Sequence, residues 1–109
     1  MDRWTEIAKL IGRTLKTLEQ ERPFDVVDVT HDEVTVRPTI NDNERRIPRE
    51  EIEGAFDELI TLGVISRVDI EARYSRYNPA YVAAILAEMP GVQYSVKPIS
   101  LWYLKADQQ

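Results

Sequence analysis

Acidic side chains crowd one short stretch of the sequence and are the residues best placed to do chemistry. The helix that we predict over 48–62 carries Glu50, Glu51, Glu53, Asp57 and Glu58. Paired carboxylates can act as a general acid and base, but such a site also needs a nucleophile, a metal ligand or a second acid facing it. The sequence places none of these nearby. We therefore interpret the acidic face of this helix as a solvated surface.

Histidine and cysteine, the other common catalytic and metal-binding residues, add little. The chain has no cysteine, which excludes disulfides, thiolate zinc sites and cysteine nucleophiles. The single histidine, His31, lies in a polar turn, where a lone histidine is usually solvated. No nucleophile–base pair or phosphate-binding loop is present. We expect a protein that is not an enzyme and has no catalytic residue, metal or cofactor.

The charge pattern limits the partners. The 109-residue chain has a net charge of −5. This argues against a general nucleic-acid coat, because non-specific affinity grows with the number of phosphates neutralised. The charge is uneven: the predicted helix over 48–62 has one arginine against five acidic residues, whereas residues 64–104 have four basic and three acidic residues. No apolar run reaches the ~20 residues of a membrane span, and the N-terminus is no signal peptide, so we expect a cytoplasmic protein.

The N-terminal half is predicted as a helix followed by strands. Apolar residues at three- and four-residue spacing predict a helix over 3–20, with its buried stripe at Trp4, Ile7, Ala8, Ile11, Leu15 and Leu18. β-branched residues on both sides of a polar turn predict a β-hairpin over 24–37. A third short strand is expected over 44–47.

The C-terminal half begins with two predicted helices. Pro48 suits the first turn of a helix whose buried face is Ile52, Ala55, Phe56, Leu59 and Leu62. Gly63 ends this helix in a left-handed conformation, with Val64 folded back on the last turn. Ser66 and Asp69 then form a capping box at the start of a short helix, which packs through Ile70.

A third helix and two strands complete the chain. Asn78 caps a helix over 78–89, in which the spacing predicts that Val82, Ile85, Leu86 and Met89 are buried. The same phase predicts that Tyr81, Ala84 and Glu88 are exposed. Strands are expected over 92–97 and 99–104, joined at Lys97-Pro98, and alternation sends Trp102 and Tyr103 to opposite faces. We expect residues 106–109 to be frayed.

The order of elements over 48–104 resembles the winged helix-turn-helix superfamily: a helix, a strand, two helices and a hairpin, the wing. The resemblance covers about half of the chain and rests on this order. It implies an α+β fold, a single compact domain over 1–109 in which an N-terminal helix and β-hairpin (1–47) lead into the winged-helix-like part (48–104). It also implies a non-catalytic DNA-binding protein, a regulator or DNA-targeting accessory, with the helix over 78–89 in the major groove.

The helix that would enter the groove departs from the DNA-reading pattern. Its groove-facing positions would be Ala80, Tyr81, Ala84, Ala87 and Glu88, whereas base readout usually needs arginine, lysine, asparagine or glutamine. The basic residues stand around this helix and suit phosphate contacts. We therefore expect DNA to be bound by Arg67, Arg73, Arg76, Asn78, Tyr81 and Lys97.

The alternative is a winged helix that binds protein, acting as an adaptor or a dimerisation unit. Small residues permit close approach of another backbone, and tyrosine and tryptophan are common anchors of protein interfaces. This interpretation predicts an interface at Tyr81, Ala84, Tyr94, Trp102 and Tyr103. The partner would be another protein or a second copy of the chain.

Overall fold

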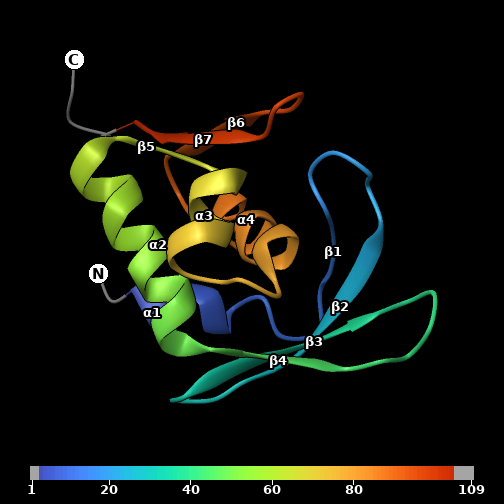
Figure 1. Ribbon diagram of the computed structural model, residues 1–109. Coiled ribbons are helices and arrows are strands. Elements are labelled where there is room, and N and C mark those ends of the chain that lie inside the picture. Colours follow the sequence, from blue (N-terminus) through green and yellow to red (C-terminus); the bar gives the residue numbers. More distant parts are fainter. Residues whose placement is uncertain (1–2, 105–109) are drawn as a thin grey trace.

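The computed structural model describes residues 3–104, and its helices lie between two antiparallel sheets (Figure 1). The predicted fraying of residues 106–109 falls outside the described residues. The N-terminal sheet has the strand order β1-β2-β3-β4 and follows a short helix. Its elements are α1 (Arg3–Ala8), β1 (Thr14–Lys16), β2 (Pro23–Val29), β3 (Glu33–Pro38) and β4 (Arg45–Pro48).

The prediction of one helix over 3–20 is wrong, because the chain leaves the helix after Ala8. Gly12 adopts a left-handed backbone conformation (φ 85°) and donates its N–H to Val26 O. The following residues form β1, in which Leu15 pairs with Phe24 of β2. Leu15 is buried in either conformation, but Ile11, expected in the buried stripe, is 44% exposed. The hairpin and the third strand are confirmed as β2, β3 and β4.

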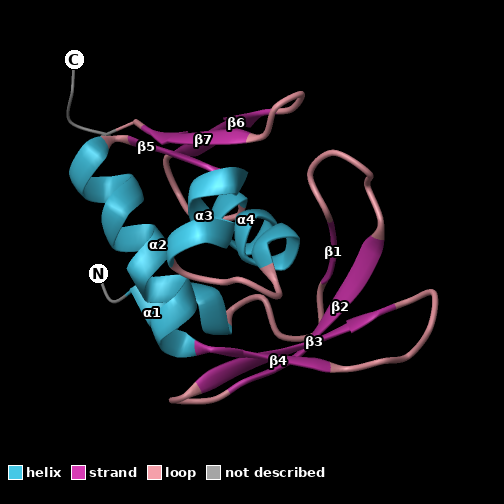
Figure 2. Cartoon of the chain, in the orientation of Figure 1, coloured by secondary structure: helices cyan, strands magenta, loops and turns pink. Residues whose placement is uncertain are grey.

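The C-terminal half folds around its own sheet, with the strand order β5-β7-β6 (Figure 2). Here β5 pairs with β7 through Ile65 and Leu101, and β6 pairs with β7 through Tyr94 and Leu101. The elements are α2 (Arg49–Leu62), β5 (Val64–Ser66), α3 (Arg67–Arg73), α4 (Pro79–Ala87), β6 (Val92–Ser95) and β7 (Ser100–Tyr103).

The helix ends follow the sequence signals only in part. Pro48 ends β4 and precedes α2 rather than standing in its first turn, and the Asn78 side chain makes no capping hydrogen bond to α4. Gly63 has the expected left-handed conformation (φ 85°) and donates to Leu59 O. The capping box is present, since Ser66 and Asp69 each accept from the other's backbone N–H. However, Leu62 is 66% exposed, and Val64 starts β5 rather than folding back on the helix. The turn at Gly63 directs both apolar side chains outward.

The core of the domain centres on α4. Val82, Ile85, Leu86 and Met89 are buried as predicted. The prediction that Ala84 is exposed is wrong, because its exposed fraction is only 2%. The helix contacts α2, α3 and β6 on one side and β1 of the N-terminal sheet on the other. The chain is thus a single compact α+β domain, as predicted, with α4 enclosed by both halves.

None of the helices within residues 3–104 is both long and apolar enough to cross a membrane. The cytoplasmic location stays a prediction.

Candidate functional site

The N-terminal sheet occupies the side of α4 that was expected to face DNA. The Tyr81 ring meets the Phe24 ring edge to face, with 4.9 Å between the ring centroids. The guanidinium of Arg45 lies 5.7 Å from the centroid of the same Tyr81 ring and donates to Asn78 Oδ1 at 3.4 Å. These contacts cover the start of this face of α4 with residues of the same chain, and Ala84, further along the helix, is only 2% exposed, so the face cannot lie in a groove in this conformation. The sequence did not show this, because the strands that carry Phe24 and Arg45 were predicted but no local pattern places them against α4.

Near the end of α4, Arg13 pairs with Glu88 at 3.3 Å. Glu88 remains exposed, as predicted. The acidic charge that would have faced phosphates is therefore neutralised by an arginine of the N-terminal half.

Two of the predicted DNA-binding arginines are held in ion pairs. Arg73 hydrogen-bonds Glu58 of α2 and lies 3.4 Å from Asp69, and Arg67 pairs with Glu71 at 3.1 Å. The hydrogen bond from Arg73, together with one from the Tyr74 hydroxyl, lowers the pKa of Glu58 below its ordinary value. Arg73 thus fastens α3 to α2, and its charge is largely compensated.

Another group of basic side chains has no carboxylate in ion-pair distance among the described residues. This group contains two predicted residues and three that the sequence analysis missed: Arg76, Lys97, Lys16, Arg22 and Arg45. Arg76 lies over the Tyr77 ring and lines a separate hollow with Val68, Glu71 and Ala72. Of these three, Lys16 lies on β1, Arg22 in the β1–β2 turn and Arg45 on β4, and no local pattern connected them with α4.

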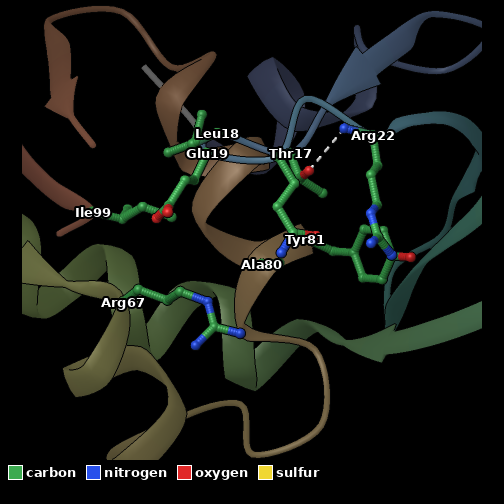
Figure 3. A pocket seen from close by; sticks show the side chains of 9 residues that line it. Thr17, Leu18, Glu19, Arg22, Arg67, Ala80, Tyr81 and Ile99 are labelled. Carbon is green, nitrogen blue, oxygen red and sulfur yellow. Dashed lines mark hydrogen bonds between the residues drawn. The ribbon is translucent and has the colours of Figure 1, made fainter. Parts of the chain in front are cut away.

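A cleft of about 350 Å³ lies between the β1–β2 turn and the first turn of α4 (Figure 3). Arg22 enters it from the β1–β2 turn and Arg67 from the start of α3, with Ala80 and Tyr81 between them. The remaining lining residues are Thr17, Leu18, Glu19, Gln20 and Ile99. We call this the basic cleft, because arginines lie on both sides of it and Glu19 is the one acidic residue in its lining.

Local backbone structure fixes the walls of the basic cleft. The Thr17 Oγ1 accepts from the Arg22 backbone N–H at 3.0 Å and closes the β1–β2 turn. On the other side, the Arg67 backbone N–H donates to Ile99 O at 3.1 Å and ties α3 to the end of the β6–β7 turn. Lys97 stands in that turn, two residues before Ile99. The structure thus brings Arg67 and Tyr81 to one opening, and Lys97 lies in the adjoining β6–β7 turn.

The residues predicted for a protein interface lie on different surfaces. Tyr81 is half-buried against the N-terminal sheet, and Ala84 is buried in the core. Tyr94 of β6 is 48% exposed. Trp102 and Tyr103 are both half-buried and pair with Gln93 and Val92 of β6, so they point to opposite faces of the sheet, as predicted.

Within residues 3–104, no three histidine, aspartate or glutamate side chains come together in a way that would hold a metal ion. The absence of enzyme activity and of a cofactor stays a prediction. Comparisons with protein-family models, with curated proteins and with solved structures find no match to this chain.

Proposed function

We propose that this chain is a non-catalytic DNA-binding protein of the winged-helix class, a regulator or a DNA-targeting accessory, which grips the phosphate backbone at the basic cleft. The order α2, β5, α3, α4, β6, β7 supports this classification, because it repeats the helix–strand–helix–helix–hairpin order of that class. The observation that carries the proposal is that Arg22, from the N-terminal half of the chain, and Arg67, from the C-terminal half, line one cleft.

The proposed contact is not the base readout in which a helix enters the major groove. The middle of α4 is buried, and its first turn, although contacted by Phe24 and Arg45, borders the cleft through Ala80 and Tyr81. Backbone contacts position a protein on DNA without reading sequence. Arg22 and Lys97 would supply these contacts, joined by Arg67 where it exchanges its ion pair with Glu71 for a phosphate, and we expect low sequence preference.

The charges suit a weak and salt-sensitive interaction. The net charge of −5 keeps the overall attraction to phosphate low, while Arg22 and Lys97 lack compensating carboxylates among the described residues. Each phosphate neutralised contributes about −0.9 to the slope of log K against log salt concentration. Contact through these cations therefore predicts a slope of only a few units.

Duplex binding measured by fluorescence anisotropy at several salt concentrations tests the proposal. Arg22→Ala and Lys97→Ala should each weaken binding about equally for unrelated duplexes and reduce the salt slope by about 0.9. Lys9→Ala is the matched control, because Lys9 follows α1 and pairs with Glu6 at 2.9 Å. This control variant should bind almost as the wild type does. If the wild type binds no duplex at about 50 mM salt, or all three variants weaken it equally, the proposal fails.

An adaptor that binds another protein is the second candidate. The covered middle of α4 favours it, because base readout by that helix is blocked, and the net charge of −5 points the same way. Failure of duplex binding, together with capture of a defined protein partner that depends on Tyr94 or Trp102, would support it.

A further inference from the structure

The four outer strands of the two sheets are not equally protected against pairing with another strand. β1 has three residues and carries Lys16, and β4 carries Arg45 and Arg46 and ends at Pro48. Charges, proline and short length are the usual means by which proteins blunt a sheet edge. β5 has three residues and runs directly into α3, whose capping box uses the Ser66 backbone N–H.

β6 is also short, with four residues, but it lacks the other two protections. Its sequence, Val-Gln-Tyr-Ser, is free of charge and proline, and Gln93, Tyr94 and Ser95 are all exposed. The next residue, Val96, is also exposed, so an uncharged segment over 92–96 lines this edge.

The register of the sheet shows which backbone groups of β6 face outward. The Leu104 N–H donates to Gly91 O across the β6–β7 pair at 2.8 Å. Backbone groups of successive residues in a strand point alternately to its two sides, so Gln93 and Ser95 also face β7. The N–H and C=O of Tyr94 therefore point away from the sheet and are available to another strand.

We propose that β6 pairs with β6 of a second copy of this chain, antiparallel and centred on Tyr94. In this register the Tyr94 N–H of each copy donates to the Tyr94 C=O of the other. The two three-stranded sheets then form one six-stranded sheet in the order β5-β7-β6-β6-β7-β5.

Charge argues for a second copy rather than a different partner strand. Each copy carries a net charge of −5, so two copies approach most easily where the surface has no charge. Centring on Tyr94 places Gln93 opposite Ser95 and Val92 opposite Val96, with no like charges facing each other. A charged partner strand would find no complementary charge on this edge. The proposal does not depend on DNA binding.

Sedimentation of the chain over about 1 µM to 1 mM protein tests the proposal. The wild type should show a concentration-dependent dimer. Tyr94→Lys places two positive charges opposite each other across the two-fold axis and should raise the dimer dissociation constant at least about tenfold, one tenfold step being 1.4 kcal/mol. Tyr94→Phe should still dimerise, because backbone groups and the ring are kept.

Val64→Lys is the matched control. Val64 and Tyr94 are each 48% exposed on an outer strand of the same sheet, but on opposite edges. Val64→Lys should dimerise as the wild type does. A wild type that stays monomeric at about 1 mM, or dimerisation lost in Val64→Lys and kept in Tyr94→Lys, would overturn the proposal.

Amide hydrogen exchange of the wild type gives a readout that needs no variant. The outward-facing Tyr94 N–H should exchange slowly at high protein concentration and fast at low concentration, while the Trp102 N–H, inside the sheet, stays protected at both. Equal, fast exchange of the Tyr94 N–H at both concentrations would contradict the paired edge. A monomer whose β6 binds an added strand peptide would instead assign the edge to a different partner.

Discussion

Replacing Phe24 by alanine should weaken the attachment of the N-terminal sheet to α4. Phe24 is among the largest fully buried side chains, and its ring contacts the Tyr81 ring edge to face at 4.9 Å. Removing a buried phenylalanine costs about 3–5 kcal/mol, of which the ring pair supplies about 0.5–1.5 kcal/mol. At about 4 °C or more per kcal/mol for a domain near this size, the melting temperature should fall by at least about 12 °C.

Urea unfolding followed by circular dichroism measures this cost. Ile40→Ala is the control, since Ile40 belongs to the β3–β4 turn of the same sheet but is 82% exposed, and it should change stability by no more than about 0.5 kcal/mol. A double-mutant cycle between Phe24→Leu and Tyr81→Leu should give a coupling energy of about 0.5–1.5 kcal/mol. A cost for Phe24→Ala below about 1 kcal/mol, or zero coupling, would refute the enclosed position of α4.

Leu86→Ala should lower the free energy of unfolding by about 2–5 kcal/mol, and Ile11→Ala by less than about 1 kcal/mol. Similar costs would instead favour a single N-terminal helix in which Ile11 is buried. Gly54→Ala should destabilise the protein despite better helix propensity, because the added Cβ would lie 2.8 Å from the Tyr74 ring. In a Tyr74→Ala background the same change should instead stabilise by up to about 1 kcal/mol, measured by thermal melting. The depressed pKa of Glu58 predicts stability that is full above the carboxyl's ordinary value of 4.5 and is lost as the pH falls through the folded-state pKa. In urea unfolding at about pH 3–6, Glu58→Gln should reduce the loss of stability as the pH falls. An unchanged pH dependence would contradict the depressed pKa of Glu58.

Local signals in the sequence predicted the C-terminal half well. The glycine at the end of α2, the capping box at Ser66 and the spacing of Val82, Ile85 and Leu86 each specify structure over a few residues, and all appear as predicted. The hairpin of β2 and β3 was found in the same way, from β-branched residues around a polar turn.

The first twenty residues were predicted wrongly because one apolar pattern fits two different structures. Trp4 and Ile7 are buried in α1, and Leu15 is buried as the central residue of β1, so three positions of the predicted stripe are inside for different reasons. The left-handed turn at Gly12 separates them, and it depends on a hydrogen bond to Val26, which is distant in sequence.

The candidate site was only partly visible for the same reason. Arg67, Tyr81 and Lys97 were found from their position around one helix. Arg22 lies in the β1–β2 turn and Arg45 on β4, and nothing local connects either of them with that helix. Only the packing of one half against the other brings Arg22 to the basic cleft and Arg45 to the Tyr81 ring.

The enclosure of α4 changes what selection acts on at its small residues. Ala83 and Ala84 have almost no exposed surface, so larger side chains there must displace neighbouring atoms of the same chain. Divergence at these positions is then restricted by packing, whatever the protein binds. Among relatives, the residues at 24 and 81 should change together in size, because their rings touch across the two halves. Arg22 and Lys97 have no such packing constraint. Among relatives, we expect them to be kept where the ligand is bound and to vary where it is not.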